Sequence, residues 1–177
     1  LVSGHSIQRV PDGSTNFANI AGPGLFSGTP GLQNVCFVAG TRIATPDGPR
    51  RVETLRPGDL VLCERGAVRL HWVGLRRLSL AEIQADPRRA PIEIAPGALG
   101  PGVPSAPLRL SPQHRVKVEG QIVRRIGGTP GALVAAVHLL GLPGVRRLEP
   151  RPVIYAHVLC ARHEVVQAEG TPCESLF

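Results

Sequence analysis

Aromatic residues, metal-type cysteine spacings and long apolar runs are all scarce or missing in this chain of 177 residues. Phe, Trp and Tyr make up only 3% of the sequence, so aliphatic side chains must fill most of a core, for which the hydrophobic content of 42% is ample. The four cysteines form no C-x-x-C pair and no zinc-type spacing with histidine, so we predict no metal site. No apolar run reaches the length of a membrane span, so we expect no membrane-spanning segment.

Lysine is also nearly absent, because Lys117 is its single occurrence and arginine supplies almost all of the positive charge. The net charge of +7 would suit a nucleic acid or an acidic surface. However, ten of the arginines fall in five separated pairs with no aromatic residues between them, whereas nucleic-acid sites combine a basic groove with stacking aromatics. We therefore interpret the charge as a solvated surface and expect no nucleic-acid partner.

Two kinds of sequence meet at Cys36. Residues 1–35 are rich in Gly, Pro, Ser and Asn, and we predict that they form a flanking arm, either a tail or the end of a preceding module. Residues 36–177 alternate apolar and polar positions, and we predict that they form one domain. Residue 1 is not methionine, so we expect the sequence to be part of a longer chain.

Short alternating runs bounded by turn residues predict an all-β domain. The expected strands, by residue range, are 41–45, 60–63, 67–73, 108–110, 115–118 and 121–125, with a hairpin of 152–159 and 164–168 around residues 160–163. Residues 85–107 contain six Pro and three Gly, which predicts a long surface connection. Residues 132–140 fit a short helix or a buried strand, and we prefer the helix.

A cysteine that begins a domain from inside a chain can attack the carbonyl of the peptide bond before it, here Val35–Cys36, through a five-membered ring. This shift needs a deprotonated thiol, a stabilised oxyanion on Val35 and a proton for the departing nitrogen. Ser111 and His114 lie three apart across a turn that contains Pro112, and His157 lies on a late strand. Each of these residues alone is most simply a packed core or surface residue, so the hypothesis depends on their joint placement.

Four ordered blocks of residues resemble the Hint domain, the self-processing module of Hedgehog C-terminal domains and inteins, and most of all the stand-alone bacterial Hint proteins. The blocks lie at Cys36–Ile43, Val52–Val61, Leu110–His114 and Tyr155–Gly170. The resemblance implies a flattened, horseshoe-shaped β fold of short strands with pseudo-twofold halves, whose ends converge on Cys36. It also implies that the upstream polypeptide is the substrate and that no cofactor is needed.

The resemblance assigns roles to single residues. Cys36 matches the nucleophile of the family, and His114 matches the histidine that activates the scissile amide. Ser111 stands where the family usually has Thr, so a hydroxyl is retained. His157 lies on the strand that elsewhere carries a catalytic Asp or Cys directly after the tyrosine, where this chain has Ala156. Its role in catalysis or in packing therefore stays open.

Two further absences narrow the hypothesis. No Asn follows Asn34, so we expect no protein splicing by Asn cyclisation, and no Asp lies near residues 75–77 to activate a sterol. We predict autocatalytic cleavage at Val35–Cys36, with the thioester resolved by water, a thiol or another small nucleophile. The alternatives are a Cys-His hydrolase that acts in trans and a non-catalytic β module for display or adhesion. The sequence does not determine the cellular compartment. The resemblance is to bacterial proteins, and secretion or a place at the cell surface are among the options.

Overall fold

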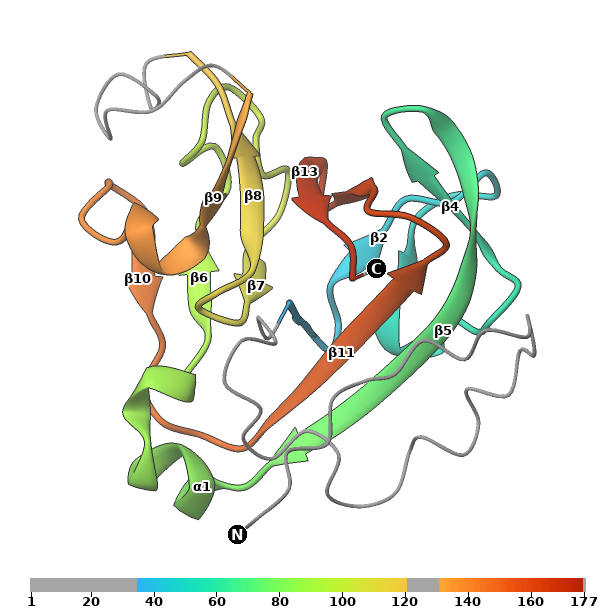
Figure 1. Cartoon of the computed structure of the whole chain (residues 1–177). Helices are drawn as coiled ribbons and strands as arrows, with labels where there is room; N and C mark the ends of the chain where they lie inside the picture. The colour runs from blue at the N-terminus through green and yellow to red at the C-terminus, as the bar shows by residue number, and fades with distance from the viewer. Residues whose placement is uncertain (1–34, 121–130, 177) are drawn as a thin grey trace, which may run out of the picture. The chain divides into compact units, whose positions relative to one another are not determined.

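The computed structural model describes residues 35–120 and 131–176 (Figure 1). The strands of the first half are β1 (Phe37–Val38), β2 (Arg42–Ile43), β3 (Arg50–Arg51), β4 (Leu60–Cys63), β5 (Gly66–Leu78), β6 (Ile92–Ile94) and β7 (Leu108–Leu110). The later strands are β8 (Arg115–Val118), β9 (Ala132–Ala135), β10 (Val145–Arg147), β11 (Val153–Cys160), β12 (Val165–Ala168) and β13 (Thr171–Glu174). The helical elements are α1 (Leu80–Ala85) and the short 3₁₀ turns η2 (Val52–Thr54), η3 (Pro87–Arg89) and η4 (Ala136–Leu139).

The all-β prediction is confirmed, and the described strands form one sheet system. Along its main path the order is β10-β6-β7-β1-β11-β5-β4-β12-β13-β8-β9, while β2 pairs with β12 and β3. None of the helices in the described residues is long and apolar enough to span a membrane. The predictions for residues 1–34 and for a strand at 121–125 lie outside the described residues.

The two longest strands, β5 and β11, run antiparallel side by side (Figure 1). β5 changes partner along its length, because its first residues pair with β4 and its later residues pair with β11. In this register His157 lies opposite Gly74, and Tyr155 lies opposite Arg76. Since side chains on one face of a strand recur every second residue, Trp72, Gly74 and Arg76 share the face of His157.

Strand β1 is short but central. Phe37 pairs with Leu110 of β7 on one side and with Ala156 of β11 on the other. The residue before β1 is therefore brought to the end of β7 and to the middle of β11. This is how the fold gathers Cys36, Ser111 and His157, although the chain separates the first from the others by 75 and 121 residues.

The buried apolar residues form two clusters, and Cys36 belongs to the smaller one, with Leu78, Ile83, Ala90, Val153 and Tyr155. Helix α1 supplies Ile83 to this cluster. Its start is fixed by a capping box, in which the Ser79 hydroxyl accepts from the Glu82 N–H and the Glu82 carboxylate accepts from the Ser79 N–H. The Tyr155 hydroxyl donates to the carbonyl oxygen of Arg89 over 2.6 Å, which ties β11 to η3.

Two sequence predictions are wrong in part. The segment 85–107 is not only a surface connection, because it contains β6, whose three residues are all buried between β7 and β10. Three residues are too few to show an alternating pattern between the prolines that flank them. Residues 132–140 are not a helix, because they form β9 and then the 3₁₀ turn η4.

The predicted hairpin of residues 152–168 is also wrong. Both strands exist, but β11 pairs with β1 and β5, whereas β12 pairs with β13, β2 and β4. The hairpin of this region is β12–β13, whose turn residues Glu169 and Gly170 both have positive φ. The left-handed conformation is unfavourable for Glu169, and its carboxylate offsets the cost by accepting the Arg42 N–H over 2.7 Å.

Candidate active site

The Val35–Cys36 peptide bond is buried at the entrance to β1, with Val35 and Cys36 exposed by only 6% and 3%. The N–H of Cys36 donates to the Ser111 hydroxyl oxygen over 3.0 Å, and the N–H of Ser111 donates to the Cys36 carbonyl over 2.9 Å. Ser111 directly follows β7, the partner of β1, so the sheet register positions this reciprocal pair. The nitrogen of the predicted scissile bond is thus held by a hydroxyl.

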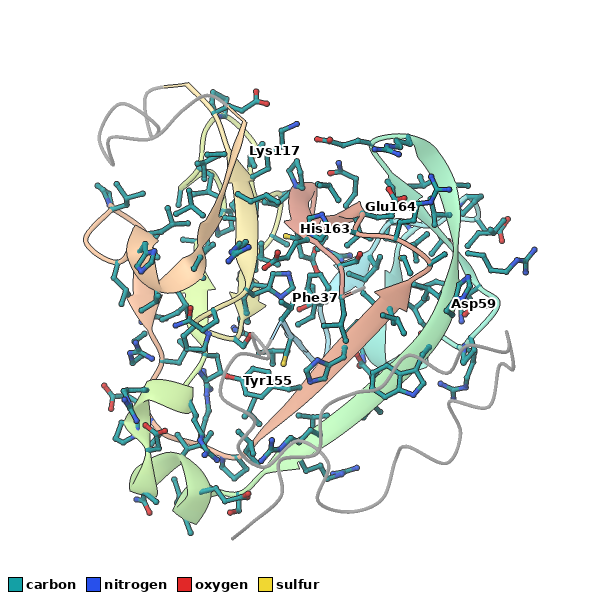
Figure 2. The ribbon with its side chains drawn as sticks, in the orientation of Figure 1. Phe37, Asp59, Lys117, Tyr155, His163 and Glu164 are labelled. Carbon is teal, nitrogen blue, oxygen red and sulfur yellow. The ribbon has the colours of Figure 1, made fainter. Side chains whose placement is uncertain are left out.

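The thiol of Cys36 lies against the imidazole edge of His157. The Sγ atom is 3.1 Å from Nε2 and 3.6 Å from Nδ1, and both residues are buried. Figure 2 labels Phe37, which follows Cys36 on β1, and Tyr155, which lies two residues before His157 on the neighbouring strand β11. At this distance a proton can pass from the thiol to Nε2, as in other Cys–His pairs.

His114 lies near the backbone of Cys36 but makes different contacts. Its side chain is fully buried, and its ring packs against Phe37 with centroids 4.3 Å apart at 60°. Within the described part of the chain, neither ring nitrogen has a hydrogen-bond partner. The backbone is well fixed, because the His114 N–H donates to the Ser111 carbonyl and the His114 carbonyl accepts from Ala136.

Glu174 of β13 supports this turn. Its carboxylate is almost fully buried and accepts the N–H of Arg115, the residue after His114, over 3.0 Å. The Arg115 guanidinium and the His163 ring also approach the same carboxylate. A charge-assisted hydrogen bond to a backbone N–H is stronger than a neutral one, so Glu174 anchors the start of β8.

Burial raises the pKa of the Cys36 thiol to about 12, while a hydrogen bond from Ser111 and the charge of Arg76 act in the opposite direction. The resting nucleophile is therefore a neutral thiol. Arg76 is half-buried on β5 and is the cation whose field lowers the cost of the thiolate.

Burial also lowers the pKa of both histidines. The pKa of His157 falls to about 4, with the charge of Arg76 acting in the same direction and the backbone of Val35 opposing it. The pKa of His114 falls to about 3, with the backbone of Cys36 and Glu174 opposing the shift and His157 adding to it. Both rings are neutral at neutral pH, and each disfavours a proton on the other. The neutral His157 ring has its Nε2 atom 3.1 Å from the thiol.

The structure brings together the residues that the sequence singled out. Cys36 contacts both Ser111 and His157, and the His114 ring packs against Phe37, with no hydrogen bond to its ring nitrogens among the described residues. Their catalytic roles stay predictions. The Ser111 hydroxyl contacts the amide nitrogen of Cys36. Sequence reasoning missed Arg76, since only the β5–β11 register reveals its place opposite Tyr155.

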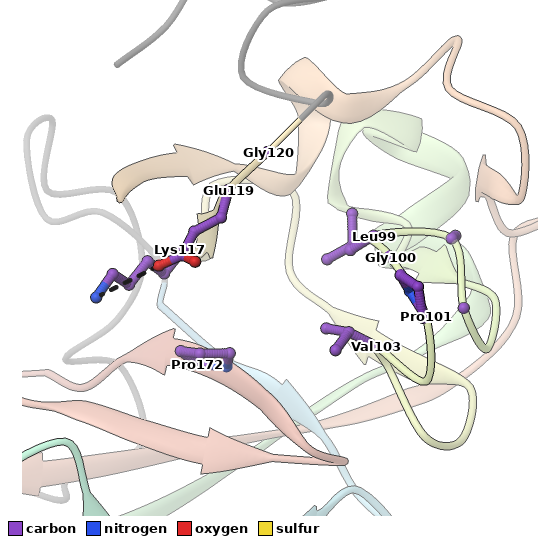
Figure 3. Close-up of a pocket in the computed structure, with 10 residues that line it drawn as sticks. Leu99, Gly100, Pro101, Val103, Lys117, Glu119, Gly120 and Pro172 are labelled. Atoms are coloured by element: carbon purple, nitrogen blue, oxygen red, sulfur yellow. Dashed lines mark ion pairs between the residues drawn. The ribbon is translucent and has the colours of Figure 1, made fainter. Parts of the chain in front are cut away.

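A separate hollow of about 780 Å³ lies between the loop around Gly97–Val103 and strands β8 and β13 (Figure 3). Lys117 and Pro172 face it from these strands, and Lys117 forms an ion pair with Glu119. None of the four predicted catalytic residues is among the described residues that line it. Across residues 35–120 and 131–176, no three His, Cys, Asp or Glu side chains converge as a metal site would need.

The fold and the buried Cys36 site define an all-β domain of the self-processing class. The chain belongs to the Hint family, because a family model described as "Hint domain" matches residues 35–177. The resemblance seen in the sequence is therefore confirmed. A comparison with curated proteins found no match.

Solved structures agree on the fold. The gp41-1 intein has a TM-score of 0.50 and 15% identity, over 78% of this chain and 96% of that one. The MchDnaB-1 intein (N145AA) has a TM-score of 0.50 and 14% identity, over 80% and 99%. A bacterial intein-like domain from Clostridium thermocellum has a TM-score of 0.49 and 16% identity, over 79% and 97%. The first two show that this chain has the all-β Hint fold.

Proposed function

We propose that this domain cleaves its own chain at Val35–Cys36 by an N-to-S acyl shift. The observation that carries the proposal is the contact of 3.1 Å between the Cys36 Sγ and the His157 Nε2, directly beside the peptide bond that the thiol would attack. Membership in a self-processing family supports the reaction class, and the geometry of Cys36 supports the site.

The first step takes place on the carbonyl side of the bond. His157 accepts the thiol proton on Nε2 while Sγ forms a bond to the carbonyl carbon of Val35, whose oxygen takes the electron pair as an oxyanion. The imidazolium that results stands close to the backbone of Val35, which already favours a proton on that ring. The half-buried Arg76 adds a second positive charge to the field, which stabilises the same oxyanion.

The second step takes place on the nitrogen side. The oxyanion re-forms a carbonyl, the carbon–nitrogen bond of Val35–Cys36 breaks, and the nitrogen leaves as the amine of Cys36 after it takes up one proton. The Ser111 hydroxyl is already in contact with this nitrogen, and the His114 side chain lies near the backbone of Cys36. A donor in this place contributes typically about 10²–10⁴ to the rate. The proton that the nitrogen takes up is the one that His157 accepted from the thiol, so the exchange balances and the His157 ring is neutral again.

The product is a thioester between Val35 and Cys36, which a second nucleophile resolves. Water gives a free carboxylate on Val35, a small thiol gives a new thioester, and an amine or alcohol gives an amide or ester. In each case the carbon–sulfur bond breaks and the Cys36 thiol is regenerated. The upstream polypeptide is released in a single turnover.

We propose cleavage without splicing. Cys173, the cysteine nearest the C-terminus, is fully buried within β13, where it pairs with Val116 and Val166. A splicing acceptor must be reached by the departing acyl group, and the burial of Cys173 does not favour this role. The competing hypothesis of a hydrolase that acts in trans requires a thiol that a free ligand can reach. Cys36 is exposed by only 3%, which does not favour this hypothesis.

The test is to follow a precursor that carries a tag before Leu1 and a fusion protein after Phe177. We expect one new N-terminus, Cys36-Phe37, with the C-terminal fusion still attached. Cys36→Ala should abolish this cleavage, and Cys173→Ala, a matched buried cysteine, should retain it. Persistent cleavage between positions 35 and 36 in Cys36→Ala would refute the mechanism, and ligated flanking segments would refute the absence of splicing.

A further inference from the structure

Trp72 is the single tryptophan of the chain, and it lies beside His157. The centroids of the two rings are 6.4 Å apart, with a tilt of 45° between their planes. Trp72 is half-buried, whereas His157 is only 4% exposed. One flank of the histidine is therefore covered by an indole, and its nitrogen edge is directed at the Cys36 thiol.

Gly74 makes this arrangement possible. Trp72 and Gly74 lie on the same face of β5, and Gly74 is the direct partner of His157 across the strand pair. A Cβ atom on Gly74 would overlap the six-membered ring of Trp72. The indole therefore lies over the glycine and reaches along the strand to the diagonal neighbour His157, a distance that aromatic side chains can span.

We propose that Trp72, lying over Gly74, is a positioning residue that holds the His157 ring against the Cys36 thiol. The inference rests on the proposed function, since it assigns His157 the role of proton acceptor. An imidazole on a half-exposed strand pair has two χ angles to fix, and an indole packed on one side removes the rotamers that turn Nε2 away. It also keeps water from the ring.

The charged and titratable groups around His157 are few among the described residues. Cys36 faces it from the start of β1, Arg76 from β5, two residues beyond Gly74, and His114 from the turn before β8. Tyr155, on the same face of β11, is held by the carbonyl of Arg89. Trp72 adds no charge, so its effect on His157 must come through packing and the exclusion of water.

The first part of the test measures cleavage in four variants. Trp72→Ala should slow cleavage by roughly 10- to 10²-fold, the size expected when a reacting group is misplaced, and Trp72→Phe should restore most of it. Gly74→Ala should slow cleavage about as much, because it expels the indole. Added to Trp72→Ala, however, Gly74→Ala should change the rate by less than about twofold, since no indole is left to displace. Leu75→Ala, on the exposed face of β5, is the control and should match the wild type.

The second part does not depend on cleavage. Nitrogen-15 NMR of labelled histidines in the Cys36→Ser precursor follows the titration of His157, which His157→Gln identifies. With Trp72→Ala, water reaches the ring and the pKa of His157 should rise from about 4 toward 6.5. An unchanged His157 titration, or a double variant slower than Trp72→Ala by tenfold, would overturn the proposal. A precursor that never cleaves, with the His157 shift present, would instead refute the proposed function alone.

Discussion

The two histidines at Cys36 differ in what their rings touch. His157 lies with Nε2 at 3.1 Å from the thiol, whereas His114 packs against Phe37 and has no hydrogen-bond partner for either nitrogen among the described residues. Burial lowers the pKa of both rings, so both are neutral at neutral pH. In the proposed reaction this difference gives the site two sides, one that would activate the sulfur and one that would release the nitrogen.

The strongest way to break this comparison is to remove the ring on the thiol side. His157→Gln leaves the Cys36 thiol without its proton acceptor, so the acyl shift should slow by about 10²–10⁴-fold. The measurement is the rate of appearance of the Cys36 N-terminus by mass spectrometry. His71→Gln, an exposed histidine on the adjacent strand β5, is the control and should cleave as the wild type does.

On the nitrogen side we expect a smaller loss. His114→Gln should slow cleavage by about 10²-fold, at the lower end of the range for proton-transfer catalysis, because it removes the ring beside the Cys36 backbone while the Ser111 hydroxyl still contacts the Cys36 nitrogen. The same assay measures it, with urea unfolding as a check on stability. A variant that cleaves at the wild-type rate would show that the ring of His114 is only a packing element.

Variants of Ser111 separate the contribution of its hydroxyl to the cleavage rate from that of the His114 ring. Ser111→Ala removes one hydrogen bond to the Cys36 N–H, whose net value is about 0.5–1.5 kcal/mol, so cleavage should slow by roughly 2- to 10-fold. Ser111→Thr keeps the hydroxyl and should retain the rate. If Ser111→Thr were as slow as Ser111→Ala, the shape of the residue rather than its hydroxyl would be decisive.

The last expected effect is on stability rather than on the cleavage rate. Both pKa values lie below the ordinary value of 6.5, at about 3 for His114 and about 4 for His157, so between these values and 6.5 the unfolded chain binds protons that the folded chain does not. Stability is fully present above pH 6.5 and falls as the pH drops toward 3. Urea unfolding at pH 7, 5 and 4 should show this decline, and His114→Gln should make it shallower. An equal decline in this variant would assign the acid sensitivity elsewhere.

The parts of this site were not equally visible in the sequence. Ser111 and His114 could be paired from sequence alone, because three residues and a proline define their turn, and the structure has that turn. The contact between Cys36 and His157 spans 121 residues, and the sequence left the role of His157 open between catalysis and packing. No local sequence pattern predicts the proposed positioning role of Trp72 and Gly74, because it depends on the register between β5 and β11.

The wrong predictions of secondary structure also have physical reasons. Strand β6 is three residues long and stands in a Pro-rich stretch, so its burial comes from its neighbours β7 and β10 rather than from its own pattern. Helix α1 did carry a signal, since Ser79 and Glu82 form the spacing of a capping box. Adjacent strands β11 and β12 suggested a hairpin, but each found its partners elsewhere in the sheet.

The central claim is that Cys36 forms a thioester with Val35, and hydroxylamine tests it most directly. This amine attacks thioesters far faster than amides, so freshly purified precursor should split into a fragment that ends in a Val35 hydroxamate and a fragment that begins with Cys36. Intact-mass spectrometry reads both products from one sample, and Cys36→Ala should yield neither. A wild-type precursor that keeps its full mass after prolonged exposure to hydroxylamine, or that splits at another bond, would contradict the account.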